Sequence, residues 1–376
     1  MFGLHIGIDL GTSAIKVFQR GRGIVFREPS VVVCDAHTGE AIAFGAEAEN
    51  MHGRTPGSMK VVYPIKEGVI NDFEMAKLLL KHYIDALCRN RVFKPTVILS
   101  VHGSLTKLEE RTLLGLVAEA DAARAFLLHE SLAAALGAGG AWREHRDKKP
   151  RTVTPIKRRR AILRPSANAD KSEKPRNPRY SKKKTEKKPA KPYGSLIVNI
   201  GAGATDAAVI SMGKIAVSRS VKTAGISLSD CIRQHILKTY DIEIGYNTAQ
   251  EIKHLIGGAL PREPEIAIIV NGKNHSTGIP LSFELSSTEI CLAMEEHVER
   301  IAECIHALLE ETSPEFMADI IKDGVLLTGG GAKLFGIDRY LQKRLGVAVV
   351  VADEPELCAV KGLGEMLAAA FGGKRQ

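Results

Sequence analysis

The sequence has no long apolar run and no leader of the usual kind. No stretch of about 18 consecutive apolar residues occurs, so no membrane-spanning helix is predicted. The N-terminus lacks the charged, apolar and small-residue order of a signal peptide, and the strand-like HIGIDLGT begins almost at once. With 376 residues, 44% of them hydrophobic, the chain is long enough for one large core or for roughly two to four packed units.

Paired cysteines and familiar catalytic spacings are also absent. The cysteines are far apart and none forms a Cys-x-x-Cys pair, which argues against a zinc site or a disulfide framework. No Ser/His/Asp order stands out either. We therefore expect reduced, mostly buried thiols in a cytoplasmic protein. The cysteines are Cys34, Cys88, Cys231, Cys291, Cys304 and Cys358.

The positive charge is concentrated in one segment. The chain has a formal net charge of +9, but residues 143–193 alone contain 20 Lys/Arg and 5 Asp/Glu. The remainder contains 32 basic and 38 acidic residues and is mildly acidic. The overall charge therefore says little about the partners of the main body.

Segment 143–193 has seven of the sixteen prolines and almost no apolar residues beyond AILR. It repels itself and buries too little apolar surface to offset its ordering entropy, so the sequence predicts disorder. The segment could be a solvated spacer without a partner. It could instead bind anionic lipid head groups, with an attraction of roughly 1 kcal/mol per basic residue, or bind nucleic acid or an acidic protein. Tyr180 is its single aromatic residue before Tyr193, which argues against base stacking and so against nucleic acid.

Strand-like and helix-like segments alternate on both sides of this segment, which predicts an α/β protein. Apolar runs predict strands, and apolar residues at spacings of three and four predict helices, one of them capped by Thr106 with Glu109 three residues on. The expected strands are 4–10, 14–19, 96–101, 195–200, 206–212, 324–328 and 347–352. The expected helices are 73–88, 106–122, 130–139, 227–240, 248–258, 287–311, 332–345 and 357–371.

One pattern occurs twice. GIDLGTSAIKVF and VNIGAGATDAAVI each place a turn of small residues between two strands, and each begins one half of the chain. Glycine lets backbone approach a phosphate closely, and LTGGGAKLFGI offers a third such turn. Two similar halves with facing turns predict a nucleotide held in a cleft between lobes. The residues offered to phosphates, metal and nucleoside are Asp9, Gly11, Thr12, Ser13, Gly201, Gly203, Thr205 and Gly329–Gly331.

These motifs resemble a known superfamily. DLGTS, GVINDFE, HESLAAALGAG, NIGAGATD, LTGGGAKLFGID and AVKGLGEML follow the order of the phosphate loops, connecting segments and adenosine loop of the actin–Hsp70–sugar kinase superfamily. Within it, EPSVV, GRTPGSMKVVYPIKEGVINDFE, SRSVKTAG and FMADIIKDGVLLTGGGAKLFGIDRYL resemble the bacterial actin-like rod-shape proteins, MreB and Mbl. The resemblance covers nearly the whole chain except residues 143–193.

The resemblance implies an actin-like ATPase fold, with duplicated ribonuclease H-like domains and four subdomains around an ATP–Mg²⁺ cleft. Domain I would span 1–142 with a subdomain at about 31–72, and domain II would span 194–350 with a subdomain at about 225–275. Residues 351–376 would return to domain I. The family further implies self-assembly into filaments at the inner face of the cytoplasmic membrane, where they organise cell-wall synthesis proteins and cell shape.

The resemblance also implies roles for individual residues, which occupy the positions of the family's site residues. Asp9 would hold Mg²⁺ through water, and Glu130 would orient the attacking water, although a capping acid at a helix start would look the same. Thr205 would lie near the γ-phosphate. Lys16 would reach a phosphate, unless it is a solvent-facing strand residue. The remaining nucleotide contacts would be Gly11, Thr12, Ser13, Asn199, Gly201, Ala202, Gly203, Ala204, Gln250, Lys253, Gly329, Gly330, Gly331 and Ala332.

Three positions depart from the family. Asn199 stands where the family has Asp, Gln250 where it has Glu, and Ile226 where it has Asp. An amide keeps the shape and the hydrogen bonds of a carboxylate but loses its charge and basicity. We therefore expect nucleotide binding with slow hydrolysis, and the rival interpretation is a scaffold that no longer polymerises or hydrolyses.

The family also has a hydrophobic membrane loop, and RVFKP occupies that place here. Val92 and Phe93 beside Arg91 and Lys94 suit insertion at a lipid interface, although a buried loop anchor would show the same pattern. A sugar kinase would need a catalytic Asp beside a substrate pocket, and VHGSLT offers none. An Hsp70-type chaperone would need a further peptide-binding domain.

Overall fold

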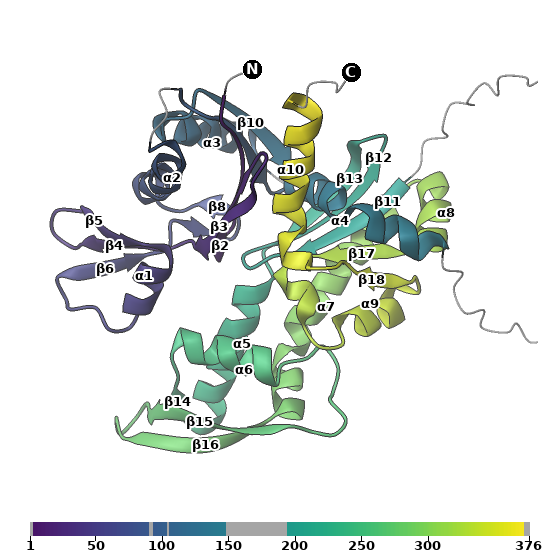
Figure 1. The fold of residues 1–376 in the computed structure, drawn as a ribbon. Helices are drawn as coiled ribbons and strands as arrows, with labels where there is room; N and C mark the ends of the chain where they lie inside the picture. Colours follow the sequence, from purple (N-terminus) through teal and green to yellow (C-terminus); the bar gives the residue numbers. More distant parts are fainter. Residues whose placement is uncertain (1–2, 90–92, 104, 148–193, 372–376) are drawn as a thin grey trace, which may run out of the picture.

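A computed structural model describes residues 3–89, 93–103, 105–147 and 194–371, with the side chains of 140–147 left out. Segment 143–193, predicted to be disordered, lies outside the described residues except for the helical backbone of 143–147. Figure 1 shows the first part of the chain, in purple and blue, on one side and the second, in teal and green, on the other, with the yellow C-terminal helix α10 between them. No helix in the described ranges is long and apolar enough to cross a membrane.

The first half is built on a five-stranded sheet with the order β10-β9-β1-β2-β3. β1 pairs antiparallel with β2 and parallel with β9. The core of β1 is an apolar run because the strand is central and covered on both faces. The strands are β1 (His5–Leu10), β2 (Ala14–Gln19), β3 (Gly23–Pro29), β9 (Thr96–Val101) and β10 (Arg124–His129).

The second half repeats this arrangement in the order β13-β12-β11-β17-β18. β11 takes the place of β1, because it pairs antiparallel with β12 and parallel with β17. The repeated sequence pattern therefore reflects a repeated fold. The strands are β11 (Gly194–Ile200), β12 (Thr205–Ser211), β13 (Lys214–Val221), β17 (Val325–Thr328) and β18 (Val349–Val351).

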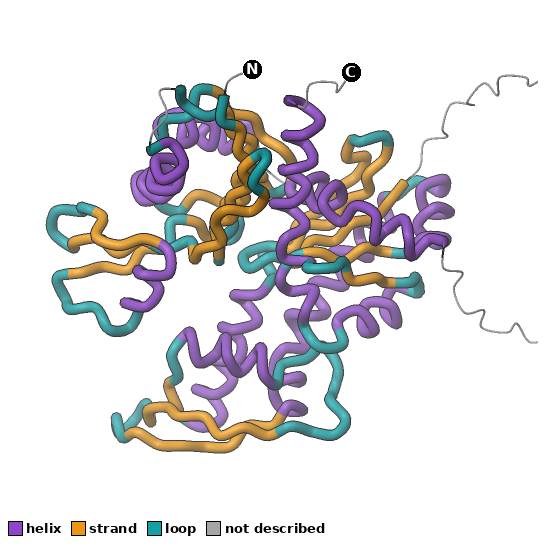
Figure 2. Tube along the Cα trace, viewed as in Figure 1, coloured by secondary structure: helices purple, strands orange, loops and turns teal. Residues whose placement is uncertain are grey.

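Helices cover both sheets, and Figure 2 shows them in purple around the orange strands. In the first half the apolar faces of α2 and α3 bury a core against the sheet; in the second, α5 and α7 are the main contributors. The helices are α2 (Phe73–Cys88), α3 (Lys107–Glu119), α4 (Glu130–Asp147), α5 (Gly225–Tyr240), α6 (Tyr246–Leu255), α7 (Ser287–Glu311), α8 (Pro314–Asp323), α9 (Ile337–Leu345) and α10 (Cys358–Phe371), with 3₁₀ turns η1 (Gly330–Lys333) and η2 (Pro355–Leu357).

Each half also carries a small sheet away from the central pair. One has the order β5-β4-β6 and is covered by α1; the other has the order β14-β15-β16. A two-stranded hairpin, β7–β8, follows the first. Their bounds are α1 (Gly45–Met51), β4 (Val32–Asp35), β5 (Ala41–Phe44), β6 (Met59–Val62), β7 (Ile65–Lys66), β8 (Val69–Ile70), β14 (Ile242–Glu243), β15 (Ala267–Asn274) and β16 (Pro280–Ser286).

The structure confirms the α/β class and the expected helices and strands, except that helix 130–139 continues to Asp147 and helix 332–345 begins only at Ile337, after the 3₁₀ turn η1. The capping box of α3 is present, with Thr106 accepting from the Glu109 N–H and Glu109 accepting from the Thr106 N–H. All six cysteines are free thiols, and four of them are buried. The sequence patterns did not indicate α1, α8, β3, β13 or the small sheets. Strands β3, β13 and β15 consist mostly of half-buried and exposed residues, so they lack the apolar run that marks a buried strand.

Helices α4 and α10 cross so closely that their backbones touch. A Cβ added to Gly137 would overlap the carbonyl oxygen of Cys358, and one added to Gly362 would overlap that of Ala133. Both helices also pack on the sheets, α10 against β1 and α4 against β11. This crossing therefore joins the two halves at a fixed spacing.

We expect Gly362→Ala to destabilise the protein by about 2–3 kcal/mol, because the new methyl group would force the two helices apart. Gly115→Ala in α3 is the matched control, since no atom lies within 4 Å of its added Cβ. The free energy of unfolding of the control should rise by about 0.5–1 kcal/mol, because alanine has a higher helix propensity than glycine. Urea unfolding of both variants measures the difference; equal stabilities would mean that the crossing adjusts without cost.

Candidate functional site

Two adjoining cavities lie between the halves. The larger has a volume of about 580 Å³ and the smaller about 60 Å³. Both are lined by residues from the turns after β1 and β11, so the smaller cavity lies directly beside the larger. The residues common to both are Asp9, Gly11, Thr12, Glu130, Gly201 and Ala202.

The two glycine turns have the same geometry. The Gly11 N–H donates to the Ala14 carbonyl at 3.2 Å, and the Gly201 N–H donates to the Ala204 carbonyl at 3.0 Å. An added Cβ would lie 3.0 Å and 2.9 Å from those same oxygens. Each turn therefore needs glycine at its first position and presents backbone and small side chains to the cavity.

The turn between β7 and β8 closes against both glycine turns. The Gly68 N–H donates to the Thr12 hydroxyl at 3.0 Å. A Cβ on Gly203 would lie 2.8 Å from the Glu67 Cα. Glu67 also forms an ion pair with Lys222 across the halves, with 2.9 Å between Oε2 and Nζ. Three segments far apart in sequence thus meet at one end of the cleft.

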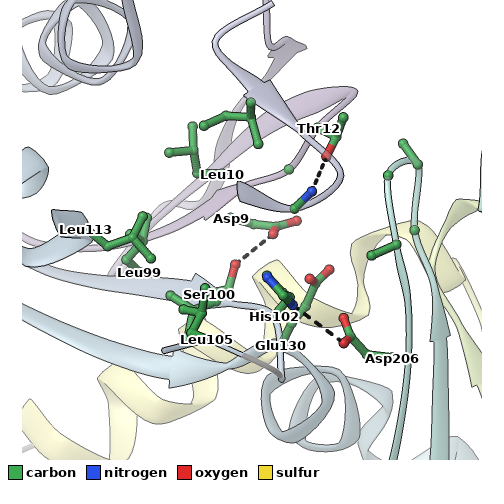
Figure 3. Close-up of a pocket in the computed structure, with 18 of the residues that line it drawn as sticks. Asp9, Leu10, Thr12, Leu99, Ser100, His102, Leu105, Leu113, Glu130 and Asp206 are labelled. Carbon is green, nitrogen blue, oxygen red and sulfur yellow. Dashed lines mark hydrogen bonds and ion pairs between the residues drawn. The ribbon is translucent and has the colours of Figure 1, made fainter. Parts of the chain in front are cut away.

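Asp9 is buried at the end of β1 and has two partners. The Ser100 hydroxyl donates to Oδ1 and the Lys16 ammonium donates to Oδ2, both at 2.7 Å. Figure 3 shows Asp9 and Ser100 on the wall of the smaller cavity. Burial would lower the pKa of Lys16, but attraction to Asp9 outweighs it and raises the pKa. Lys16 is therefore a charged cleft residue and not a solvent-facing one, while its contact with a phosphate stays a prediction.

Asp206 is a site residue that the sequence analysis did not single out. Its side chain is buried, and its Oδ1 accepts from the Gly103 N–H at 3.2 Å and lies 3.9 Å from His102 Nδ1. Figure 3 places His102 and Asp206 on the same side of the smaller cavity as Glu130. The available signal was an acid at the second position of an otherwise apolar strand, β12.

Glu130 begins α4 and lines both cavities. Burial raises its pKa to about 8, and repulsion from Asp9 and Asp206 adds to the effect, against the attraction of Lys16 and a hydrogen bond from Asn199. A carboxyl at a helix N-terminus would normally be stabilised as the anion. Here burial and the two neighbouring acids disfavour the anion more strongly than the helix N-terminus favours it. Glu130 is therefore protonated at neutral pH in the absence of ligand.

Asn199 occupies in β11 the place that Asp9 occupies in β1. Its Oδ1 accepts from the Thr328 hydroxyl at 3.2 Å, as Asp9 accepts from Ser100. Across the hairpin Asn199 pairs with Asp206, whereas Asp9 pairs with Lys16. The amide therefore lies between two carboxyl groups, Glu130 and Asp206, and adds no negative charge to them.

The larger cavity is also lined by α6 and by the segment after β17. Gln250 and Lys253 come from α6, and Gly329–Gly331, which lie against Ile200 at the end of β11, come from the segment after β17. Lys253 Nζ donates to the Gly225 carbonyl at 2.6 Å and to the Ser229 hydroxyl at 2.8 Å. Burial lowers the pKa of Lys253 to about 8.

Most of the predicted nucleotide-site residues line these cavities, but Thr205 and Ala332 do not. Thr205 is fully buried, and its hydroxyl donates to the Thr223 carbonyl at 2.7 Å. Ala332 is buried behind the glycine segment. Val92 lies outside the described residues, while the side chain of Phe93 is 69% exposed and therefore no buried anchor. The roles predicted for all of these site residues, including Thr205, Ala332 and Phe93, stay predictions.

The residues present fit a nucleotide with a divalent cation. A volume of about 580 Å³ is in the usual range for a cofactor site, and both glycine turns line it. Mg²⁺ is typically held by one or two carboxylates together with phosphate oxygens and water, and Asp9 and Glu130 are suitably placed. The smaller cavity, lined by carboxyl groups, has room for water.

Two lobes of the same topology, with facing glycine turns across one cleft, define an actin-like nucleotide-binding fold. The sequence pattern of the family described as "MreB/Mbl protein" matches residues 3–146 and 187–372. The chain therefore belongs to the MreB/Mbl family. The part without a match lies in the basic segment.

Individual relatives agree with this assignment. The chain is 35% identical to the cell shape-determining protein Mbl of Bacillus cereus, over 98% of this chain and 96% of that protein. It is 33% identical to the cell shape-determining protein MreB of Escherichia coli, over 98% and 94%. A crystal structure of MreB5 of Spiroplasma citri bound to ADP has a TM-score of 0.81 at 29% identity and covers 98% of this chain and 97% of that one. The MamK double helical filament, at 20% identity and a TM-score of 0.71, shares the fold.

The raised pKa of Glu130 predicts a pH-dependent stability. Between the unfolded pKa near 4.3 and the folded value of about 8, the unfolded chain loses the proton that the folded chain keeps. Stability therefore falls as pH rises through this window. Glu130→Gln removes the cost of burying an ionisable carboxyl group. Without nucleotide, the melting temperature of this variant should therefore exceed that of the wild type at pH 8, by roughly 2–4 °C for each kcal/mol of stability gained. Near pH 4.5 the two melting temperatures should match.

Glu356→Gln is the control for this experiment. Burial would raise the pKa of Glu356, but its bond with Lys333 outweighs burial and lowers the pKa. This variant should be less stable than the wild type at pH 8, the opposite sign. Thermal unfolding at several pH values measures both variants. If the melting temperature of Glu130→Gln did not rise relative to the wild type between pH 4.5 and pH 8, the raised pKa assigned to Glu130 would be wrong.

Proposed function

We propose that this chain is an ATP-binding, actin-like filament protein that helps to determine cell shape, with slow ATP hydrolysis. The observation that carries the proposal is the pair of equivalent glycine turns facing one cavity between two like-folded lobes. The relatives named as cell shape-determining proteins support the cellular role. We also propose the division into four subdomains around the cleft, with the boundaries predicted from the sequence.

The proposed hydrolysis uses the smaller cavity. Water in that cavity would lie beside Glu130, whose carboxylate would orient it and accept its proton. This role needs Glu130 ionised, and a pKa of about 8 keeps most of it protonated at neutral pH without ligand. Bound Mg²⁺ would supply positive charge near Asp9 and Glu130 and favour the ionised form. Asn199 adds neither charge nor basicity, which is why we propose a slow reaction.

Asn199→Asp tests this assignment. The new carboxylate would stand beside Glu130 and Asp206, so we expect lower thermal stability without a divalent cation and recovery when Mg²⁺ and nucleotide are added. Phosphate release should rise about tenfold, equivalent to ~1.4 kcal/mol of barrier. ATP affinity in the presence of Mg²⁺ should change less than about threefold.

Thr328→Val is the matched control for that substitution. It removes the hydroxyl that donates to Asn199 Oδ1 and leaves the amide in place. Its phosphate release should stay near the wild-type rate. If Asn199→Asp released phosphate no faster than Thr328→Val, the slow step would not depend on the charge at this position.

We further propose that the filaments lie on the inner face of the cytoplasmic membrane and act with cell-wall synthesis proteins. Phe93, exposed beside Lys94, supports a lipid contact by an apolar residue flanked by positive charge. Segment 143–193, with its excess of Lys and Arg, would add attraction to anionic lipid.

Electron microscopy with Mg-ATP on anionic liposomes tests assembly and attachment together. We expect filaments lying on the lipid for the wild type, and filaments released into solution for Phe93→Ser. Met212→Ser is the control, because Met212 is 77% exposed at the turn between β12 and β13. Deletion of residues 145–190 should weaken lipid binding at low salt and matter less at raised salt, where the basic charges are screened. Absence of filaments with ATP and with a non-hydrolysable analogue would refute the polymer.

A scaffold that neither polymerises nor hydrolyses is the second candidate, and Asn199 is the observation in its favour. Nucleotide binding alone stabilises the folded state and raises the melting temperature. A melting temperature that rises with Mg-ATP, without filaments, would identify a nucleotide-binding scaffold. No rise would identify a module that has lost its ligand.

A further inference from the structure

The smaller cavity is lined by a histidine that the proposed hydrolysis does not use. His102 directly follows β9, in the first half of the chain, and lines this cavity together with Glu130 and Asp206. Its side chain is only 10% exposed. Imidazole is the group that proteins use most often as a general base. Its place on the wall of a cavity with room for water therefore bears on the reaction.

Contacts from both halves of the chain hold His102 in position. Its Nδ1 lies 3.9 Å from Asp206 Oδ1, and the N–H of the next residue, Gly103, donates to that same oxygen at 3.2 Å. Figure 3 shows the ring turned toward Asp206. A Cβ added to Gly68 would lie 3.1 Å from His102 Cδ2, so the ring also lies against the turn between β7 and β8. The imidazole is thus placed before any ligand binds.

The charges around this ring favour a cation on it. The side chain of Asp206 is 3% exposed, so its attraction for a charge 3.9 Å away is screened less than it would be at the surface. The other charged groups near the ring are also mostly carboxyl groups. Element by element, they are Asp9 of β1, Glu67 of the β7–β8 turn, Glu109 of α3, Glu130 of α4 and Lys222 after β13.

A second proton acceptor matters because Glu130 accepts a proton only when it is ionised. Burial and the neighbouring acids raise the pKa of Glu130 to about 8 without ligand. A neutral imidazole needs no prior loss of a proton, because its ring already carries a lone pair. When it accepts a proton it becomes a cation among carboxyl groups, which is a favourable change in this cavity.

We propose that His102 is a second proton acceptor for the attacking water, beside Glu130, and that Asp206 positions it and stabilises the imidazolium. The inference rests on the proposed ATP hydrolysis and adds a base to it. The water oxygen bonds to the γ-phosphorus as the bond from that phosphorus to the bridging oxygen breaks, which yields phosphate and ADP. One water proton passes to a ring nitrogen of His102 and leaves from there to solvent. His102 is then a catalytic residue and Asp206 a positioning residue.

Single-turnover phosphate release by the full-length chain at saturating Mg-ATP, measured at pH 6, 7 and 8, tests the proposal. A positioned base contributes roughly 10²–10⁴-fold to a rate. Because Glu130 remains, we expect His102→Gln to be only about tenfold slower than the wild type at pH 8. Imidazole takes up a proton between about pH 5 and 8 and then accepts no other. The difference should therefore shrink to about threefold or less at pH 6, whereas a structural effect would give one ratio at every pH.

His297→Gln is the matched control. His297 in α7 is half-buried like His102 but lines neither cavity. This variant should release phosphate at the wild-type rate. Both variants should bind a non-hydrolysable ATP analogue within about threefold of the wild-type affinity, because only proton acceptance is removed. Their melting temperatures report any loss of folding.

Asp206→Asn tests the positioning role. Asparagine keeps an acceptor for the Gly103 N–H but loses the charge beside the ring. It should slow phosphate release about threefold in the wild-type background and not at all together with His102→Gln, because Asp206 acts through His102. Equal slowing in both backgrounds would refute that role.

Two results would overturn the inference and leave the proposed hydrolysis intact. One is equal release by the wild type and His102→Gln, and the other is a difference between them that stays the same from pH 6 to pH 8. No phosphate release by the wild type would refute the hydrolysis and the inference together.

Discussion

The backbone contact between α4 and α10 is the constraint on which the rest of the structure depends. Gly137 and Gly362 let the two helices approach until backbone meets backbone, and each helix is also packed on a central sheet. Side chains at these positions would hold the sheets further apart. The glycine turns after β1 and β11 would then no longer face one cavity, and the contacts of the Glu67–Gly68 turn with Thr12 and Gly203 would be lost. The spacing of the lobes thus fixes the geometry of the site.

Within that spacing, the duplication brings like residues together and creates an electrostatic problem. Asp9, Asp206 and Glu130 approach one another because each belongs to a strand end or helix start that converges on the cleft. The two halves reduce this repulsion between carboxyl groups in different ways. In the first, Lys16 stands opposite Asp9 on the neighbouring strand; in the second, an amide, Asn199, stands opposite Asp206. Burial raises the pKa of Glu130 most, and the remaining repulsion from Asp9 and Asp206 raises it further. An amide at position 199 is therefore consistent with the local charges as well as with slow hydrolysis.

Much of this could be predicted from the sequence because its signals are local. The repeated strand–turn–strand pattern identified both glycine turns, and apolar periodicity identified the long helices. Position 199 stood out because an amide ended a strand that otherwise matched the family pattern. Asp206 and His102 were missed because their contacts join residues 103 or more positions apart in the sequence. The small sheets were missed because their strands are either very short, as in β5, or largely exposed, as in β15, which leaves little apolar pattern to detect.

The charges around the glycine turns bear on how phosphate could be held there. The carboxyl groups of Asp9 and Glu130 line the cavity beside the turns, while Lys253 donates to Gly225, whose N–H in turn donates to Gly201 in the turn after β11. Lys16 is already bonded to Asp9 and offsets its charge. A divalent cation bound together with phosphates would turn their repulsion from these carboxyl groups into attraction, because its own charge is the largest in such a site. The carboxyl groups that destabilise the cleft without ligand are therefore the groups that would favour a phosphate–cation pair.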